Sequence, residues 1–523
     1  MHDFHNKLCS LLLGEYFGSI VQCIGISLAY GTKTLHAICF RTKLPRAKVR
    51  EGLHVLMKHG FVTSGEYDER IGYTLHLNKV IMLLRLPRYT LFVKTMCGDE
   101  GEIMLEEVLK HGYITASELI IKTYKRIEQT PSKSVQLSFV PNLKEVFELL
   151  VKNQFLMHST LVNTTIEEEQ AEKPVYDLPE LDVMAISNVL EGQNVELADN
   201  KLYWKVNFDR LTQDLRDQIV ISAMTPRFDK NAEELMRQLI NLMYLRTASW
   251  ASTSNPIPYS EIKEAVKKLS YQELEHYLDQ YLQLLEEDST QFIKRVGDSG
   301  GGQYSINMKN AFVQLIWATL DHIVTERFGP KAARIFRLVR DEINVNMEQI
   351  QNLAMIPAKE AKSLTYTLSQ ENYIQIQEMR KNGTLSGPAK VLYRFYIDFD
   401  RLVEMETEHC YQALYNIIKR RDLETTNNKR IIEKQLRIQI LSNKFEEHGA
   451  SEQQLTDIAE MMTPSETQQF ENAQNAIKKL AATQLQIDET LFLLMLFSIV
   501  IYSAFDVSIY EEKSSRIVCN INK

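Results

Sequence analysis

Residues 297–301 match a catalytic motif. They read Gly-Asp-Ser-Gly-Gly, the sequence that surrounds the nucleophilic serine of chymotrypsin-like proteases. Ser299 would need a histidine base and a buried aspartate, which those enzymes place on two β-barrels. The chain has no Ala-Ala-His-Cys-like segment before this motif and no β-barrel pattern. Strands expected at 292–296 and 303–308 flank the motif instead, so we interpret it as the glycine-rich tip of a β-hairpin.

The other residues that could perform chemistry are not grouped as an active site requires. The twelve histidines have no metal-ligand spacing, and the six cysteines contain no Cys-x-x-Cys pair. This pattern excludes the usual zinc sites, provides no disulfide framework and favours a reducing compartment. Residues 300–302 are not followed by the Lys-Ser or Lys-Thr of a phosphate-binding loop. We therefore predict no catalytic residue, no metal and no cofactor.

Basic side chains recur at helical spacing in three stripes. The net charge of −8 gives no overall attraction to nucleic acid, so any contact must come from such local patches. Solvated helix surface explains any single residue, whereas the stripes together also suit nucleic acid or an acidic partner. The first stripe contains Lys43, Arg46, Arg50 and His54; the second contains Arg327, Lys331, Arg334, Arg337 and Arg340; the third contains Lys419, Arg420, Arg421, Lys429 and Arg430.

The first stripe belongs to a helix-turn-helix that is followed by a β-hairpin. A short helix at 35–40 leads into a second helix that begins near Pro45. Proline is accepted at the first position of a helix, because a backbone N–H at that position has no hydrogen-bond partner within the helix. Gly60 can adopt the left-handed conformation that ends a helix. Two short strands follow at 61–62 and 71–77. This order is typical of a winged helix, and its buried helix face is expected to consist of Val49, Leu53 and Leu56.

The same template recurs three more times at intervals of roughly a hundred residues, which indicates tandem modules. Such a series suits the binding of nucleic acid or other subunits. Pro357 falls where Pro45 falls in the first copy. The matching apolar positions are Val49, Leu53, Leu56 and Phe61 in the first copy, Leu143, Phe147, Leu150 and Phe155 in the second, and Ala361, Thr365, Leu368 and Tyr373 in the fourth. The third copy places Leu274, Leu278, Tyr281 and Leu285 on one face.

Three further segments frame these modules. Residues 4–30 are expected to form one long leading helix. Residues 163–195 are rich in Glu and Asp, contain two prolines and show little periodicity, so we interpret them as an acidic, largely disordered linker. A heptad seam then runs through Phe470, Ala473, Ile477, Leu480, Gln484, Ile487, Leu491 and Leu494.

Residues 404–448 carry a weaker seam, at Ile431, Ile438, Leu441 and Phe445, so we expect an antiparallel hairpin in which each arm covers the apolar stripe of the other. The apolar run at 491–505 is shorter than the ~20 residues that a membrane helix needs. It is better interpreted as a buried or partner-covered helix end.

The predicted fold is mainly α with small β wings, in the form of four tandem winged-helix domains followed by a C-terminal antiparallel coiled-coil hairpin. The predicted domains are winged helix 1 at 1–82, winged helix 2 at 83–162, an acidic flexible linker at 163–199, winged helix 3 at 200–310, winged helix 4 at 311–404, the hairpin at 405–497 and a tail of unknown role at 498–523.

Bulk properties agree with a multidomain globular chain. A length of 523 residues predicts several domains, and 44% hydrophobic with 24% charged residues is an ordinary globular composition. The charged first ten residues and the short apolar run at 11–13 do not form a cleavable signal. We expect a nuclear or cytosolic protein.

This domain order resembles the large winged-helix, TFIIE-alpha-like subunit family of eukaryotic RNA polymerase III. Local sequence carries the resemblance from Lys7 to Leu494. The matching segments are Lys-Leu-Cys-Ser-Leu-Leu-Leu at 7–13, the glycine-rich wing at 296–304, Arg-Ile-Phe-Arg-Leu at 334–338, Ala-Met-Ile-Pro-Ala-Lys-Glu-Ala-Lys at 354–362 and Ile-Asp-Glu-Thr-Leu-Phe-Leu-Leu at 487–494. The residues after Leu494 do not match the family.

The resemblance implies a nuclear, non-catalytic subunit on the clamp of the polymerase. Its partners would be a second winged-helix subunit, a small acidic subunit and the TFIIIB factors, and its role would be promoter opening on tRNA and 5S RNA genes. The family is also linked to the sensing of foreign cytosolic DNA. We expect non-sequence-specific DNA contact and no membrane, and the candidate contacts are Lys43, Arg46, Arg50, Arg334, Arg337, Lys359, Lys362, Arg420 and Arg421.

Two other classes of interaction protein fit parts of the sequence. A scaffold subunit of the proteasome-lid or cullin type also combines winged helices with helical arms, but it would place a single winged helix after a helical solenoid. A free-standing sequence-specific repressor would need a strongly basic recognition helix, which only the first module approaches.

Overall fold

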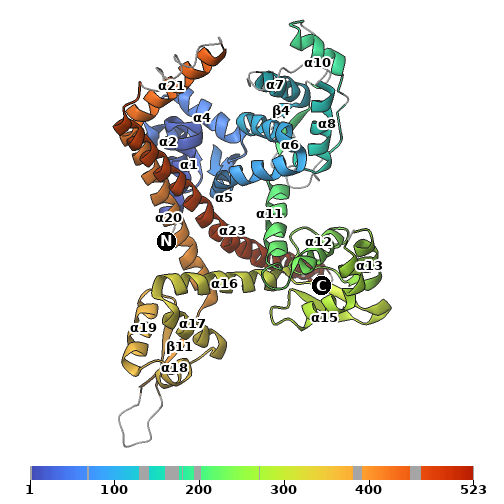
Figure 1. Ribbon diagram of the computed structural model, residues 1–523, viewed down its shortest axis with the longest axis vertical. Helices are drawn as coiled ribbons and strands as arrows, with labels where there is room; N and C mark the ends of the chain where they lie inside the picture. The colour runs from blue at the N-terminus through green and yellow to red at the C-terminus, as the bar shows by residue number, and fades with distance from the viewer. Residues whose placement is uncertain are drawn as a thin grey trace, which may run out of the picture. The chain divides into compact units, whose positions relative to one another are not determined.

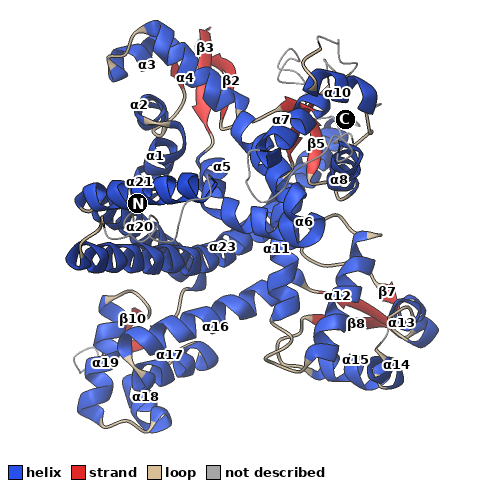
Figure 2. Ribbon diagram, turned by 45° about the horizontal axis from the view of Figure 1, so that its top comes forward, coloured by secondary structure: helices blue, strands red, loops and turns tan. Residues whose placement is uncertain are grey.

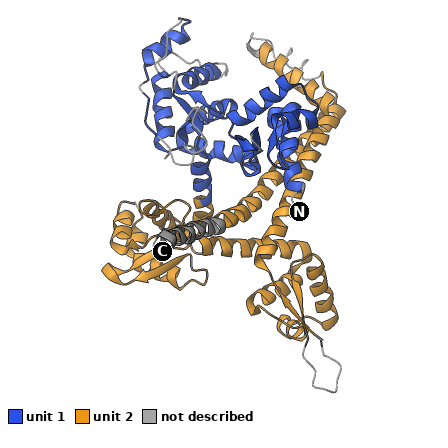
Figure 3. Cartoon of the chain, turned by 180° about the vertical axis from the view of Figure 1, so that it is seen from behind, with its two compact units in different colours: residues 1–216 blue, residues 217–523 orange. Residues whose placement is uncertain are grey.

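The computed structural model describes residues 3–67, 70–128, 140–159, 176–179, 181–193, 199, 202–269, 271–380, 391–447 and 461–521. The chain divides into two compact units, Met1–Arg216 and Asp217–Lys523 (Figure 3). Both are mainly helical, and their described residues include small antiparallel sheets of two or three strands (Figure 2).

The first unit begins with two helices where the sequence predicted one. Gly18 has a φ of +87°, which takes it out of the helical region and separates α1 from α2. Leu8 and Leu12 are buried, but Tyr16 and Ile20 on either side of the break are 47% and 38% exposed. The prediction of one continuous helix at 4–30 is therefore wrong, and the buried face of α1 does not continue beyond the break. The first elements are α1 (Asp3–Phe17), α2 (Ser19–Leu28), β1 (Lys33–Thr34), α3 (Leu35–Thr42), α4 (Arg46–Lys58), β2 (Val62–Tyr67), β3 (Arg70–Leu75), α5 (Leu77–Ile81) and η1 (Met82–Arg85).

The second group of elements differs from the prediction in its last strand. The elements are α6 (Leu86–His111), β4 (Ile114–Thr115), α7 (Ala116–Glu128), α8 (Val140–Lys152), β5 (Leu156–Ser159), α10 (Val183–Leu190), β6 (Tyr203–Val206) and α11 (Phe208–Ser222). Strand β6 lies between β4 and β5. The predicted domain boundaries at 162 and 200 are thus wrong, because the second sheet is completed by residues that follow the predicted linker.

The predicted linker is also partly ordered. Asp182 caps α10 by accepting hydrogen bonds from the backbone N–H groups of Met184 and Ala185. Ile186 is fully buried in the hydrophobic core of this module. Residues 181–193 are therefore a packed part of the first unit, which corrects the prediction of a flexible linker for them. The most acidic part of the predicted linker, residues 163–175, lies outside the described residues.

The second unit contains the third and fourth modules. The elements of the third module are α12 (Lys230–Tyr244), β7 (Ile257–Pro258), α13 (Tyr259–Lys267), α14 (Gln272–His276), α15 (Leu278–Glu287), β8 (Ile293–Gly297), η3 (Ser299–Gly301) and β9 (Gln303–Ile306). Those of the fourth are α16 (Met308–Phe328), α17 (Pro330–Glu342), α18 (Met347–Ala354), α19 (Ala358–Gln370), β10 (Gln375–Arg380) and β11 (Val391–Tyr396).

Long helices complete the second unit. They are α20 (Phe399–Asn427), α21 (Lys429–Glu447) and α23 (Pro464–Ile521). Side-chain contacts join Phe399 to Phe497, Arg421 to Gln484 and Lys434 to Glu466. In these three pairs the residue number on α20 or α21 rises while the number of the contacting residue on α23 falls. Helix α23 therefore runs antiparallel to α20 and α21, as Figure 1 also shows.

The helical hairpin is confirmed, but its weaker seam is less covered than predicted and its last helix runs past the predicted boundary. Helix α23 packs mainly on α20, while Leu441 and Phe445 of the weaker seam remain 39% and 41% exposed. The predicted boundary at 497 also falls inside α23. By length and composition, Pro464–Ile499 could cross a membrane. Residues 491–494, 496 and 497 are nevertheless buried within the second unit, as predicted for a covered helix end.

The modules share one strand order. In each three-stranded sheet, the second strand of the wing hairpin lies in the middle. The first strand of that hairpin lies on one side of it, and a short strand that precedes a helix lies on the other: β1-β3-β2, β4-β6-β5 and β7-β9-β8. In the fourth module, β10 pairs with β11, and Val345 forms a bridge to Phe395 of β11. We use the term recognition helix for the helix before each wing, namely α4, α8, α15 and α19.

The recognition helices also share one way of ending. A residue with positive φ precedes a buried aromatic residue in all four: Gly60-Phe61, Gln154-Phe155, Gln291-Phe292 and Asn372-Tyr373. The N–H groups of Phe61, Phe155 and Tyr373 donate to the carbonyl oxygens of Leu56, Leu150 and Leu368 at 3.0, 3.0 and 2.9 Å. This left-handed helix end turns the chain into the wing in each module.

Candidate nucleic-acid interface

The core positions predicted from the repeat are buried. All twelve predicted positions in α4, α8, α19 and the residues after them are at most 5% exposed. In the third module Leu274, Leu278 and Leu285 are buried, and Tyr281 is half-buried. The helix is broken at Tyr277, between α14 and α15. The apolar spacing thus identifies the inner face of each recognition helix.

The first stripe lies on the outer face of α4. Arg46, Arg50 and His54 are exposed there, and Lys43 is exposed in the turn before the helix. Among the described residues, neither Arg46 nor Arg50 has an ion-pair partner. These cations are therefore available to phosphate oxygens, which lysine and arginine contact most often in protein–DNA complexes.

Helix α19 of the fourth module presents a similar face. Lys359 and Lys362 are exposed and have no ion-pair partner within the described part of the chain. Alignment on Pro45 and Pro357 places Lys362 at the position of Arg50. The same alignment places Tyr366, which is 69% exposed, at the position of His54. Tyr366 was not among the predicted residues, and extending the repeat alignment to the exposed face would have identified it.

The second stripe is largely neutralised inside the fourth module. Arg337 Nε lies 2.7 Å from Asp321 Oδ1, and Lys331 Nζ lies 2.6 Å from Glu360 Oε1. Arg334 Nη1 donates to the carbonyl oxygen of Ala354 at 3.1 Å. The other two members also have local acidic partners, Glu371 for Arg327 and Asp341 for Arg340. The structure thus gives this stripe an internal role in holding helices together.

Arg327 takes part in a buried junction with the helical arm. Its Nη1 donates to Tyr373 Oη at 2.8 Å, and Tyr373 donates to the carboxylate of Glu406 on α20. Burial and the adjacent carboxylate of Glu406 raise the pKa of Tyr373. The hydroxyl therefore stays protonated and joins the fourth wing to the arm.

Three cations of the third stripe have partners within the helical arms. Arg420 forms an ion pair with Glu424 at 2.6 Å, and Arg421 donates to Gln484 of α23 at 2.8 Å. Lys429 lies 3.8 Å from Glu433. Arg421 therefore connects the two arms, and its guanidinium is not free for nucleic acid.

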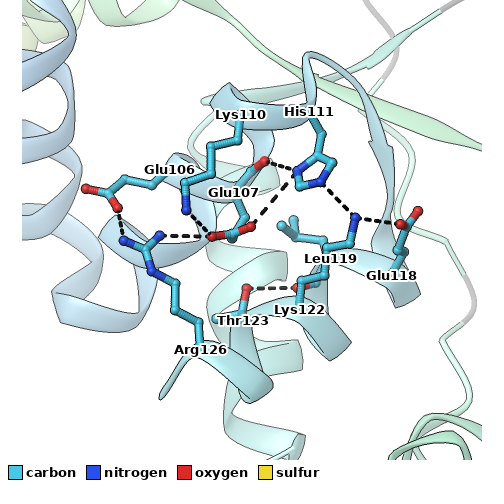
Figure 4. A network of polar contacts seen from close by, with 9 residues as sticks. All are labelled: Glu106, Glu107, Lys110, His111, Glu118, Leu119, Lys122, Thr123 and Arg126. Carbon is cyan, nitrogen blue, oxygen red and sulfur yellow. Dashed lines mark hydrogen bonds and ion pairs between the residues drawn. The ribbon is translucent and has the colours of Figure 1, made fainter. Parts of the chain in front are cut away.

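The basic side chains of the second module form a local network between α6 and α7 (Figure 4). Arg126 binds Glu106 at 2.5 Å and Glu107 at 3.0 Å, while Lys110 binds Glu107 at 2.7 Å. Burial raises the pKa of Glu107, but the hydrogen bonds and charges of Lys110 and Arg126 outweigh burial and lower it. Lys122 Nζ donates to His111 Nε2 at 2.8 Å, so His111 Nδ1 carries the proton that is donated to the carbonyl of Glu107. These groups stabilise the module.

The Gly-Asp-Ser-Gly-Gly segment is a wing tip, as predicted. It joins β8 to β9, and Gly300, Gly301 and Gly302 have φ values of +64°, +95° and +121°. Ser299 is exposed, and its carbonyl oxygen accepts a hydrogen bond from the N–H of Gly302 at 3.3 Å. Glycine is needed here for backbone conformation, which explains the motif without catalysis.

Models of known protein families match four parts of the chain. Residues 7–67 match the RNA polymerase III subunit RPC82 helix-turn-helix domain, and 158–315 match RNA polymerase III subunit RPC82. Residues 320–397 match the POLR3C C-terminal winged-helix domain. Residues 430–493 match the helical hairpin domain of DNA-directed RNA polymerase III subunit RPC3.

Whole-length relatives agree with these matches. The chain is 34% identical to DNA-directed RNA polymerase III subunit RPC3 of Rattus norvegicus over 519 residues, which cover 93% of this chain and 97% of that protein. The Homo sapiens protein of the same description is 34% identical over 520 residues, and that of Danio rerio is 33% identical over 526, with the same coverage. The chain therefore belongs to the RPC3 (RPC82) family of non-catalytic RNA polymerase III subunits.

Proposed function

We propose that this chain acts in transcription initiation as part of a three-subunit subcomplex of RNA polymerase III, where it helps to open promoter DNA. In this proposal the four modules are tandem winged-helix domains, and α20, α21 and α23 form an antiparallel coiled-coil hairpin. The second domain extends from residue 83 to residue 206, with residues 160–202 inserted before its last strand.

The observation that carries this proposal is the repeated cationic position on α4 and α19. Arg50 and Lys362 occur at the same place in two recognition helices, each on the outer face and each without an ion-pair partner among the described residues. The recognition helix of a helix-turn-helix domain is the element that approaches DNA. We therefore assign DNA contact to Arg46, Arg50, Lys359 and Lys362, with Lys43 beside them.

The other two recognition helices lack this feature. Helix α15 contains Asp279, Glu286 and Glu287 and no lysine or arginine, so it would repel phosphates. Lys144 of α8 is already hydrogen-bonded within the chain. Of the predicted contacts, we retain the pairs on α4 and α19 and assign intramolecular roles to Arg334, Arg337, Arg420 and Arg421.

The proposed partners follow from membership of the family. They are the clamp of the largest polymerase subunit, a second winged-helix subunit, a small acidic subunit and the TFIIIB factors, in the nucleus, on tRNA, 5S rRNA and other small RNA genes. A few weak, sequence-independent phosphate contacts suffice in such an assembly, because the polymerase supplies most of the affinity through a high effective concentration. A role in sensing foreign cytosolic DNA would use the same contacts.

The test separates promoter opening from RNA synthesis. Polymerase III prepared without this chain should extend RNA on a template with a pre-opened bubble, since the active site belongs to other subunits. It should fail on the same promoter as a closed duplex, and adding back the chain should restore initiation. Normal initiation by the depleted enzyme on closed DNA, or failure on the bubble template, would contradict the proposal.

A further inference from the structure

The chain inserts a segment into its second winged-helix domain and returns that segment to the domain. Strand β5 ends at Ser159 and its neighbour β6 begins at Tyr203. Between them, α10 lies against α7 and α8, as Figures 1 and 2 show. The helix-turn-helix face of this domain is therefore in contact with part of the same chain.

The insertion is held by apolar burial. Ile186 is fully buried, and Val183, Val189 and Leu190 pack on the same core. Met184 on the opposite side of α10 is 72% exposed. A helix of eight residues has little stability alone, so these contacts keep α10 in place.

The insertion also binds a basic residue of the recognition helix, Lys144. Leu143 aligns with Val49, so Lys144 of α8 occupies the position of Arg50 in α4. Arg50 is exposed without an ion-pair partner among the described residues, whereas Lys144 Nζ donates to the carbonyl oxygen of Leu181 at 3.2 Å. An insertion oxygen thus takes the place that a phosphate oxygen would occupy.

A second oxygen of the insertion lies at the start of α7. Asp199 is 3% exposed, and its Oδ2 accepts a hydrogen bond from the backbone N–H of Ser117 at 2.7 Å. In the first domain the equivalent residue, His36, is exposed at the start of α3. Helix N-termini of this kind bind phosphate groups, because their N–H groups and the helix dipole favour an anion.

We infer that residues 176–179, 181–193 and 199 form an intramolecular strap that closes the second winged-helix domain to nucleic acid by occupying two phosphate positions, one at Lys144 and one at the N-terminus of α7. This inference rests on the proposed function, since it treats the second module as a nucleic-acid-binding fold. Residues 176–179 and 181–193 contain Asp177, Asp182 and Glu191 but no lysine or arginine, so the strap itself repels DNA.

Release of the strap tests the inference in the full-length chain. Ile186→Asp should detach α10, whereas Met184→Asp adds the same charge to its exposed side. Affinity for a short fluorescent DNA duplex is measured by anisotropy over a salt series. Ile186→Asp should bind more tightly than Met184→Asp, and the slope of log K against log salt should steepen by roughly 0.9 for each additional phosphate that the chain neutralises. Adding Lys144→Glu should abolish the increase in affinity.

Hydrogen exchange locates the effect. In Ile186→Asp, DNA should newly protect peptides from 116–128 and 140–152. If this variant unfolds the domain, Asp199→Ala decides, because it removes the side-chain oxygen that accepts the hydrogen bond from the Ser117 N–H at the start of α7, and it should still raise affinity. Unchanged affinity in both variants would overturn the inference. The proposed function fails separately if charge reversal on α4 and α19, made in a chain with an intact strap, leaves DNA affinity equal to that of the wild type.

Discussion

Arg50 and Lys362 occupy equivalent positions in two recognition helices, each directly after a fully buried residue, Val49 or Ala361. Burial of that neighbour fixes the rotation of the helix, so the cation that follows it points outward. Other basic residues at helical spacing form ion pairs within the chain, as Arg337 does with Asp321. Exposure without an ion-pair partner, rather than basic character alone, therefore distinguishes the candidate DNA contacts.

Charge reversal on α4 should weaken initiation. Arg46→Glu with Arg50→Glu removes two phosphate contacts and adds repulsion, so transcription from a closed promoter should fall, and it should fall further as salt rises. Extension on a pre-opened template should not change. Lys267→Glu with Lys268→Glu makes the same change in charge on exposed residues of the third module and serves as the control. An equal defect in both double variants would show that only net charge matters.

Lys362 and Arg337 should have opposite phenotypes. Lys362→Ala should lower the affinity of the chain for duplex DNA and leave its melting temperature unchanged. Arg337→Ala loses the ion pair with Asp321 and should cost at most about 1 kcal/mol of stability, because the pair is partly exposed. Its DNA affinity should equal that of the wild type. Reduced DNA binding by Arg337→Ala without loss of stability would contradict its assignment to the fold.

The wing tip of the third module should tolerate loss of its serine but not of its glycine. Ser299→Ala should leave folding and transcription unchanged, and a fluorophosphonate probe should not label Ser299. Gly302→Ala should destabilise the protein by about 1–3 kcal/mol, because Gly302 has a φ of +121° and an added Cβ would lie 3.2 Å from the ring of Tyr304. Labelling of Ser299 would instead favour a hydrolase.

The arms should be most sensitive near the C-terminal end of the seam. Leu494 is 1% exposed, so Leu494→Asp buries an unpaired charge and should cost about 3 kcal/mol or more. Leu480 is only half-buried, and Leu480→Asp should cost clearly less. Lys478→Asp on the exposed side provides the control, and thermal unfolding followed by helix content measures all three. The reverse order of the two leucine variants would show that the arms pair differently.

His59 should make stability depend on pH. It lies against Phe17, with ring centroids 4.8 Å apart, and burial, assisted by the charges of Lys58 and His111, lowers its pKa from 6.5 to about 4. Between these values the unfolded chain binds more protons than the folded chain, so stability is complete above about pH 6.5 and decreases as pH falls toward 4. The slope should not exceed about 1.4 kcal/mol per pH unit. His59→Gln should flatten this part of the denaturation profile, and an unchanged profile would exclude His59 as the cause.

Much of the fold follows from local sequence. Spacings of three and four residues between apolar side chains predict which helix face is buried, and the predicted residues of α4, α8 and α19 are buried. Glycines in the wing of the third module predict a turn, because only glycine readily adopts the positive φ values found there. Gly18 was missed as a break between α1 and α2, since an isolated glycine is also tolerated inside a helix.

Only the tertiary structure decided which segment completes each sheet and which cation is free. Strand β6 joins β4 and β5 across more than forty residues, because strand pairing depends on contacts that composition and periodicity do not encode. Arg334 and Lys362 both appear in the sequence as basic residues at helical spacing. One binds the carbonyl of Ala354, while the other has no ion-pair partner in the described part of the chain. Sequence by itself determined the modules and their inner faces. Folding determined which cations on the outer faces are engaged, because a cation binds whichever carbonyl or carboxylate oxygen the fold brings within hydrogen-bonding distance.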